Sequence, residues 1–396
     1  MKIKLRCIFN FWFLVFSFSS SMSSAYAMGE RPTREPRYVR VAVIRSTPSL
    51  SLTLRGPYKI RTLHTDEPIF VGKGLRGAKV SPTPSGIKIN ESTFKIYRLN
   101  IETERAGGIY LNRRRFRGSI DIIREADQTL LVVNEIDVED YLYGVLRGEV
   151  PHRWPLEALK AQAVAARTFA LYQNSINVDR DYDLTSDIYS QVYGGKSIER
   201  FWTNRAVNRT RGQVLIYNGK LFPTYYHATC GGHTEDASKL WDIELTPLKG
   251  VKDPFCRKSP HFQWRSVVNL REVRTKLASH GYKVGRILSI IPKGRDRAGR
   301  IEQVEILHND GRLEILAHRF RRIVGIGLIR STNFTSKIEG SIIKFYGLGW
   351  GHGVGLCQWG THFMARKGYK YDQILRHYYP DAEIVNLNEH TTYGTK

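Results

Sequence analysis

A glutamate beside a chain-breaking proline is the residue best suited to acid–base chemistry in this sequence. Glu149 stands in the tetrapeptide Gly-Glu-Val-Pro at residues 148–151, and the carboxylates Asp137, Glu139 and Asp140 precede it within twelve residues. Its sequence neighbours include the apolar side chains Tyr143, Leu146, Val150 and Trp154. Such neighbours exclude water and so raise the pKa of a carboxyl, which would let Glu149 hold a proton near neutral pH and donate it.

A helix is predicted directly after this glutamate. Pro155 suits its first position, where the backbone amide has no partner within the helix, and the pattern predicts four to five turns. The stretch is apolar on nearly every side, which indicates a central, buried helix.

Two cations project from this apolar helix, and a buried cation needs a partner. Lys160 and Arg167 either pair with the carboxylates before Glu149 and stabilise the fold, or line a site together with Glu149. We favour the second alternative and count Lys160, Gln162 and Arg167 among the candidate substrate-binding residues.

A polar and aromatic segment follows at residues 181–195, with the sequence DYDLTSDIYSQVYGG. Aromatic faces and short polar side chains bind sugars, so the segment could line a carbohydrate groove. Its candidate residues are Asp187, Gln191 and Tyr193; the alternative is an ordinary polar loop.

Five glycines alternate with other residues at positions 347–355, which lets the backbone approach a ligand or another strand closely. No Gly-Lys-Ser/Thr follows, so the segment is not a phosphate-binding loop. A helix is predicted at residues 356–367, and His352, Gln358 and Trp359 near its start are candidate substrate-binding residues. The alternative is that the glycines serve only tight packing against the central helix.

Cysteines and histidines leave two structural alternatives open. Beyond Cys7 the sequence has Cys230, Cys256 and Cys357, an odd number for an exported chain. A disulfide between Cys230 and Cys256 is the first choice, with Cys357 as a buried thiol. The second choice is a structural zinc site, whose ligands would be His227, Cys230, His233 and Cys256. The absence of a paired C-x-x-C motif weakens the signal for zinc, so we expect no cofactor, with this structural zinc as the alternative.

The N-terminus predicts export. Three basic residues precede a short apolar run, and the Ala-Tyr-Ala sequence at residues 25–27 is typical of a signal-peptidase site. No later segment is a candidate membrane span. The net charge of +24 would attract polyanions, but a signal peptide argues against nucleic acid and for the anionic groups of an envelope. We expect a periplasmic or envelope location.

The overall pattern predicts an α+β fold of mixed architecture with a central buried helix. Short alternating segments predict a β-rich module at residues 28–125, after the signal peptide at 1–27. The core is expected at 126–263, an α+β insertion at 264–335, and the Gly-rich loop with C-terminal helices that complete the core at 336–390.

Three long motifs resemble those of the SpoIID/LytB family, which includes stage II sporulation protein D and the amidase enhancer. They are GEVPHRWPLEALKAQAVAARTFAL from residue 148, YYHATCGGHTEDA from residue 225 and GWGHGVGLCQWGTHFMARKGYKYDQILRHYYP from residue 349. The similarity runs over residues 39–380 and implies that 126–263 is the catalytic core. It implies a peptidoglycan lytic transglycosylase whose catalytic glutamate is Glu149. Some family members bind zinc near the second motif, through ligands whose spacing this sequence does not clearly reproduce.

A single glutamate would suffice for that reaction. A lytic transglycosylase needs no second carboxylate, because the hydroxyl on carbon six of N-acetylmuramic acid attacks the anomeric carbon and leaves a 1,6-anhydro end. The expected partner is a glycan strand, preferably one stripped of its stem peptides. The alternative function is a non-catalytic wall-binding protein that recruits or stimulates an N-acetylmuramoyl-L-alanine amidase.

Overall fold

The computed structural model describes residues 37–62, 67–104 and 108–388 of the chain. The predicted signal peptide, including Cys7, lies outside these residues. Among the described residues, no helix combines the length and the apolar character that a membrane span requires.

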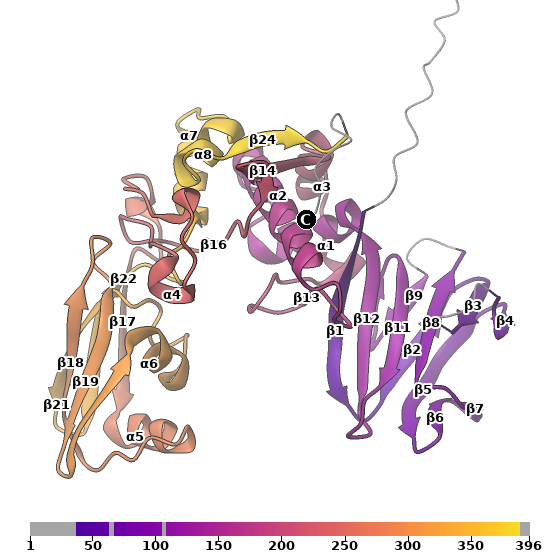
Figure 1. Cartoon of the computed structure of the whole chain (residues 1–396), viewed down its shortest axis with the longest axis horizontal. Coiled ribbons are helices and arrows are strands. Elements are labelled where there is room, and N and C mark those ends of the chain that lie inside the picture. Colours follow the sequence, from indigo (N-terminus) through magenta and orange to yellow (C-terminus); the bar gives the residue numbers. More distant parts are fainter. Residues whose placement is uncertain (1–36, 63–66, 105–107, 389–396) are drawn as a thin grey trace, which may run out of the picture. The chain divides into compact units, whose positions relative to one another are not determined.

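The first part of the described chain is rich in strands, as its alternating pattern predicts (Figure 1). One sheet has the order β13-β1-β12-β11-β8-β3-β4 and is built from β1 (Tyr38–Thr47), β3 (Tyr58–Arg61), β4 (Phe70–Gly72), β8 (Arg98–Thr103), β11 (Ser119–Arg124), β12 (Leu130–Asp137) and β13 (Leu184–Thr185). A second sheet has the order β10-β9-β2-β5-β6-β7 and is built from β2 (Leu50–Leu54), β5 (Leu75–Thr83), β6 (Gly86–Ile89), β7 (Ser92–Phe94), β9 (Ile109–Leu111) and β10 (Arg114–Phe116). Both sheets contribute to one hydrophobic cluster, which also includes residues of the helices that follow.

Strand β12 leads directly into helix α1 (Val138–Glu149). Asp137 caps this helix, because its side chain accepts a hydrogen bond from the amide of Glu139. The backbone becomes extended at the residue after Glu149 and Pro151 follows, so the helix ends at the candidate catalytic residue.

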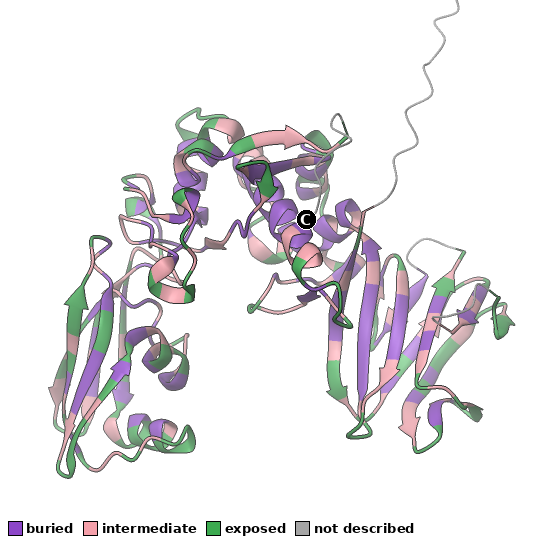
Figure 2. Cartoon of the chain, viewed as in Figure 1, coloured by how far each residue is buried: buried purple, intermediate pink, exposed green. Residues whose placement is uncertain are grey.

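Helix α2 (Leu156–Ile176) is the predicted central helix, and its burial confirms that prediction (Figure 2). Its 21 residues make it longer than the predicted four to five turns. It contacts α1, α3 (Phe201–Arg209), α7 (Gln358–Arg366) and α8 (Tyr371–Tyr378), so α2 supports the elements that surround Glu149.

The other elements of this part are short. Asn218 and Gly219 both have positive φ, as a two-residue hairpin turn requires, and join β14 to β15. The remaining short helices and strands of this part are η1 (Gly195–Ile198), β14 (Gln213–Tyr217), β15 (Lys220–Leu221), β16 (Tyr226–His227), α4 (Ser238–Trp241), η2 (Thr246–Leu248), η3 (Cys256–Lys258), β23 (Leu356–Cys357) and β24 (Glu383–Asn386). The predicted helix at 356–367 therefore begins two residues late, because residues 356–357 pair with β16 in parallel.

A further α+β segment has a hydrophobic cluster of its own, which includes Phe320, Phe334 and Phe345. Its elements are β17 (Gln263–Asn269), α5 (Leu270–Ser279), β18 (Ile287–Arg295), β19 (Ile301–His308), β20 (Gly311–Leu316), α6 (Ala317–Val324), β21 (Phe334–Glu339) and β22 (Ile342–Leu348). They form sheets of order β17-β22-β21 and β18-β19-β20. Together with the β-rich part and the helices around α2, this confirms the predicted mixed α+β class.

Candidate active site

The carboxylate of Glu149 is held by the backbone of a neighbouring loop. Its Oε1 accepts a hydrogen bond of 2.6 Å from the amide of Val192. Two glycines of α1 allow this approach: a Cβ at Gly148 would lie 2.4 Å from the carbonyl oxygen of Val192, and a Cβ at Gly144 would lie 2.5 Å from the ring of Tyr193. The glycines therefore let the loop lie against the helix and bring its amide to Glu149.

Burial raises the pKa of the Glu149 carboxyl above its ordinary value. The amide of Val192 and the side chains of Gln358 and Tyr226 oppose this shift, because they favour the charged form. Glu149 is also the last residue of α1, where the partial negative charge of a helix end disfavours a carboxylate. Since Glu149 keeps partial exposure to solvent, it is a carboxyl that can both hold a proton and reach a ligand.

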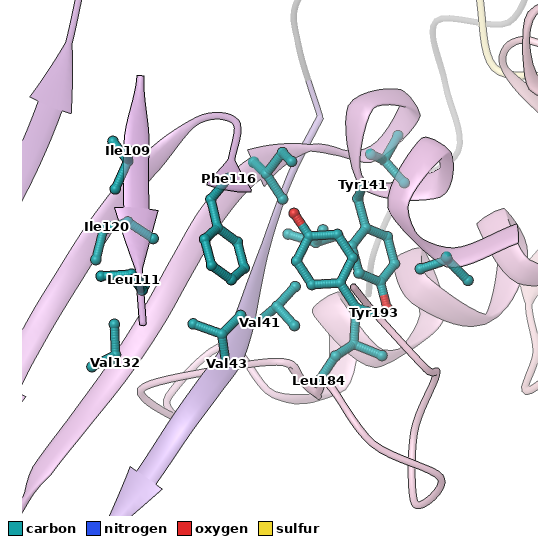
Figure 3. Close-up of a cluster of buried hydrophobic side chains, with 14 of the residues drawn as sticks. Val41, Val43, Ile109, Leu111, Phe116, Ile120, Val132, Tyr141, Leu184 and Tyr193 are labelled. Atoms are coloured by element: carbon teal, nitrogen blue, oxygen red, sulfur yellow. The ribbon is translucent and has the colours of Figure 1, made fainter. Parts of the chain in front are cut away.

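A buried network fixes the loop that carries Val192. Gln191 accepts a hydrogen bond of 2.9 Å from the hydroxyl of Tyr141 and donates one of 3.1 Å to the carbonyl of Ala166 in α2. Tyr193 packs against Tyr141 with ring centroids 4.9 Å apart, next to Phe116 of the β-rich part (Figure 3).

These contacts correct the substrate-binding roles predicted for Gln191 and Tyr193. Both side chains are almost fully excluded from solvent. Their hydrogen bonds and ring contacts are made within the fold, so they position the Val192 amide rather than touch a substrate.

Partly exposed aromatic rings lie close in sequence to Glu149 and to its hydrogen-bond partner Gln358. Trp359 follows Gln358 in the chain, and its ring centroid lies 5.1 Å from that of Trp154. Further ring contacts extend this group to His362, Phe363, His261 and Trp350. A set of partly exposed aromatic faces of this kind is suited to a sugar ligand.

The Gly-rich segment packs on the second motif rather than on the central helix. A Cβ at Gly355 would lie 2.1 Å from the carbonyl oxygen of Tyr225, and a Cβ at Gly353 would lie 2.5 Å from the guanidinium of Arg300. His352 accepts a hydrogen bond from the amide of Val354 at Nδ1 and donates from Nε2 to the carbonyl of Tyr226 at 2.9 Å. Burial and the nearby arginines lower the pKa of His352 to about 3, so its imidazole is neutral. Its backbone partner Tyr226 connects it to the surroundings of Glu149.

The two cations of the central helix are not placed together with Glu149. Arg167 is fully buried and forms an ion pair of 2.7 Å with Glu139, so the structural alternative holds and the predicted substrate contact is wrong. Burial alone would raise the pKa of Glu139, but Arg167 brings it below its ordinary value. Lys160 pairs with Glu157 at 3.0 Å and lies over the ring of Tyr371, so neither alternative describes it.

Two other candidates differ in their placement. Asp187 pairs with Arg45 at 2.7 Å and lines a pocket of about 610 Å³ whose lining does not include Glu149. Gln162 is buried on α2, one turn before Ala166, and its amide nitrogen has no hydrogen-bond partner among the described residues. That nitrogen is enclosed within the fold, so the structure does not place Gln162 on a surface open to a substrate.

The cysteine predictions need correction. Cys230 and Cys256 are free thiols whose sulfur atoms lie 3.4 Å apart, well beyond the S–S bond length of about 2.05 Å, so the predicted disulfide is absent. The predicted zinc set is only half assembled: Cys230 and Cys256 meet, but Nδ1 of His227 donates to the carbonyl of Val354 and Nδ1 of His233 to that of Thr234. Instead, Cys357 and Asp253 complete the group around Cys230 and Cys256.

Sequence reasoning missed several residues of this site. The Val192 amide carries no side-chain signal, so no sequence pattern could have revealed it. Tyr226 lies within the second motif, and only the fold brings its side chain to the Glu149 carboxyl.

This chain has an α+β fold with the desolvated Glu149 carboxyl at the end of α1. It can now be compared with known proteins. Residues 126–217 match the family model described as SpoIID, stage II sporulation protein, and residues 247–355 match a domain of unknown function (DUF8618). The chain is 34% identical to an uncharacterized protein of Brachyspira hyodysenteriae, over 93% of this chain and 96% of that protein.

Two named relatives extend the comparison. Stage II sporulation protein D of Bacillus amyloliquefaciens is 31% identical, over 67% of this chain and 78% of that protein. The amidase enhancer of Bacillus subtilis is 28% identical, over 62% of this chain and 40% of that protein. The chain therefore belongs to the SpoIID/LytB family.

Proposed function

We propose that this protein is an exported lytic transglycosylase that cleaves the bond between N-acetylmuramic acid and N-acetylglucosamine in peptidoglycan glycan strands. The observation that carries the proposal is the Glu149 carboxyl, which burial biases toward the protonated form while the Val192 amide fixes its orientation. Family membership supports a role at the cell wall, since named relatives are a sporulation protein and an amidase enhancer.

In the proposed reaction, Glu149 first acts as the acid. Its proton passes to the glycosidic oxygen as the bond from that oxygen to carbon one of N-acetylmuramic acid breaks. The hydroxyl on carbon six of the same sugar then bonds to carbon one, and its proton returns to the Glu149 carboxylate. The products are a 1,6-anhydro end and a free hydroxyl on N-acetylglucosamine, and no water is consumed.

The surroundings of Glu149 support each step. The Val192 amide orients the carboxylate that forms after the first transfer, which limits the movement needed for the second. Trp154 and Trp359 offer faces on which sugar rings can lie. The side chains of Gln358 and Tyr226 favour the carboxylate that forms after the first transfer, because they hydrogen-bond its charged form.

The first prediction concerns the products. Purified peptidoglycan, intact and amidase-stripped, is incubated with the protein and analysed by mass spectrometry. The unaltered protein should release fragments with 1,6-anhydro ends, and Glu149→Gln should release fewer by at least a hundredfold while binding the strands equally, since general acid catalysis contributes about 10²–10⁴-fold. Glu91→Gln, which alters an exposed carboxylate, should retain activity. Anhydro ends from Glu149→Gln at the normal rate would remove Glu149 from the mechanism.

The second candidate function is a non-catalytic wall-binding protein that stimulates an amidase. The similarity to the amidase enhancer favours it. On this hypothesis neither form yields anhydro ends, both bind glycan, and both accelerate peptide release by an added N-acetylmuramoyl-L-alanine amidase.

A further inference from the structure

Three buried thiols and one buried carboxylate meet beneath the Gly-rich segment. Cys230, Asp253, Cys256 and Cys357 each offer one atom, and these four atoms all lie within 4.8 Å of one another. They come from three separate segments: the residues after β16, the loop that ends in η3, and strand β23 before α7. These segments are far apart in the sequence, so nothing in the order of the chain requires their four side chains to meet.

The spacing of these atoms fits a single tetrahedral metal ion. The sulfur of Cys230 lies 3.4 Å from that of Cys256 and 3.2 Å from Oδ2 of Asp253. Four ligands around a zinc ion with Zn–S distances of about 2.3 Å would be about 3.7 Å apart. Oδ1 of Asp253 already accepts hydrogen bonds from the amides of Phe255 and Cys256, which orients the carboxylate and leaves Oδ2 toward the sulfurs.

The polar groups around the cluster suit thiolates. Cys357 Sγ accepts from the amides of Cys230 and Gly360 at 3.3 and 3.4 Å, and Cys230 Sγ accepts from the amide of Gly232 at 3.3 Å. The buried guanidinium of Arg300 donates to the carbonyl of Cys230 at 3.2 Å. Three thiolates and a carboxylate around a divalent ion carry a net charge of −2, and these donors and the arginine offset it.

We propose that Cys230, Asp253, Cys256 and Cys357 bind one zinc ion. Binding replaces the three thiol protons, which pass to solvent, by three Zn–S bonds and one Zn–O bond. Because four protein ligands close the tetrahedron, the ion is structural and joins the second motif to the start of α7. The histidines of the second motif take no part.

Metal content and spectroscopy test this without any activity assay. The purified protein should contain one zinc ion per chain by mass spectrometry of the elements. After exchange with cobalt(II), it should show thiolate-to-cobalt charge-transfer absorption and the intense visible bands of a tetrahedral site. A protein without stoichiometric metal, or one whose cysteines are joined in a disulfide, overturns the proposal.

Variants test the ligand set. Cys357→Ser and Asp253→Asn should lower the zinc content or weaken retention against a chelator at least tenfold, and should lower the melting temperature. His233→Ala is the matched control, because it removes a histidine of the second motif and should keep the zinc. Loss of zinc in His233→Ala with retention in Asp253→Asn would assign a different set. If a variant does not fold, the cobalt spectrum of the unaltered protein still decides whether thiolates bind the metal.

A separate observation concerns a pocket of about 200 Å³ between α4 and α6. Trp241, Arg321, Arg322 and His352 are among its lining residues, which include no acidic residue. Trp241 is 40% exposed and its ring lies 4.3 Å from that of Tyr225. The pocket is smaller than the roughly 300–1,000 Å³ of sites that enclose drug-sized ligands, so it would take one sugar unit or a charged substituent.

The arginines of this pocket have no anionic partner in the described part of the chain. The Nε of Arg321 donates to the carbonyl of Ile329, and burial together with nearby Arg300 lowers the pKa of Arg321 to about 10. Arg322 is exposed and forms no ion pair with a described carboxylate. A planar guanidinium binds a carboxylate through two parallel hydrogen bonds.

We infer that this pocket binds the carboxylate of a sugar acid, namely the lactyl group of an N-acetylmuramic acid unit that has lost its peptide. This inference rests on the proposed function, because His352 and Tyr226 place the pocket next to the surroundings of Glu149. Helix α6 would thus select stripped strands, whose lactyl carboxylates are free.

Binding measurements separate this inference from the proposed reaction. Calorimetry uses Glu149→Gln, which leaves strands uncut, with stripped strands and with the same strands after amidation of their carboxylates. Arg321→Met and Arg322→Gln in that background should each weaken binding of stripped strands about tenfold and leave binding of amidated strands unchanged. Arg319→Gln, on the same helix but outside the pocket lining, should bind normally. Equal losses for both substrates overturn the inference, whereas absence of anhydro ends from unaltered protein would overturn the reaction alone.

Discussion

The pKa of the Glu149 carboxyl is subject to two opposing effects, and both act on this single residue. Burial raises the pKa of its carboxyl, and the Val192 amide lowers it. The result is a carboxyl that gives up its proton less readily than one in water, as a general acid must. A charged Glu149 in this buried environment lowers the free energy of unfolding. The effect can therefore be tested by stability measurements without substrate.

Glu149→Gln should change the pH dependence of stability. Because the pKa of Glu149 is raised in the folded protein, its stabilising contribution is full below the ordinary value of 4.5 and is lost as pH rises through the raised value. Glutamine has no such proton. The variant should therefore exceed the unaltered protein in free energy of unfolding by more at pH 8 than at pH 4. Urea denaturation at both pH values checks this, and an equal difference would contradict a raised pKa.

Arg167 and Glu139 form the second residue-scale case. Arg167→Met should lower the free energy of unfolding by about 3–5 kcal/mol, because it leaves the Glu139 carboxylate buried without its counter-ion. The double change Arg167→Met with Glu139→Leu should recover most of that loss, since an apolar pair needs no compensation. Denaturant titration of the three variants measures this. A single variant that costs less than about 1 kcal/mol would show that water reaches Glu139.

Helix α1 determines the site at the scale of an element. Its glycines remove side chains where the loop of residues 191–195 lies against the helix. Alanine is intrinsically better than glycine inside a helix by about 1 kcal/mol, so the sequence gives up helix propensity for close packing. The two effects have opposite signs, and mutation can separate them.

Gly148→Ala should reduce both stability and activity. Its Cβ would lie 2.4 Å from the carbonyl oxygen of Val192, so the loop must move and its amide leaves Glu149. We expect a loss of about 1–3 kcal/mol, as for other overpacked sites. Release of anhydro ends should fall with it. Gly327→Ala is the control, because nothing lies within 4 Å of a Cβ at that position. A more stable Gly148→Ala variant would show that helix propensity prevails.

Arg300 connects separate parts of the chain at the scale of the whole molecule. It belongs to the α+β segment of residues 263–348, yet it donates to the carbonyls of Gly351 and Cys230 and lies 3.8 Å from Glu235. Its side chain is almost fully buried. It therefore couples this segment to the second motif and to the Gly-rich segment.

Arg300→Met should weaken that coupling. We expect a loss of about 3–5 kcal/mol, because Glu235 remains buried without its counter-ion. Calorimetry should show a broadened or divided unfolding transition. Lys239→Met is the matched control: Lys239 pairs with Glu302 across the same two parts, but both side chains are about half exposed and the pair should contribute no more than about 1 kcal/mol. One sharp transition in Arg300→Met at unchanged temperature would contradict this role.

Features that depend on local pattern could be predicted from the residues alone. Alternating apolar residues predicted the β-rich part, and the apolar character of the stretch after Pro155 predicted a central buried helix. The long motifs predicted the family, since they preserve residue identity over many consecutive positions.

The contacts between distant residues, by contrast, became known from the fold. The segment that ends at Glu149 is a helix. Asp137 caps its start, and its glycines leave room for the loop of residues 191–195. Arg167 pairs with Glu139 rather than with Asp137 or Asp140, because the side chain of Glu139 is the one buried opposite it in α1. Cys357 joined Cys230 and Cys256, 127 and 101 positions before it in the sequence, because β23 pairs with β16. These pairings depend on burial and on contacts between distant segments. The spacing of residues along the chain specifies neither.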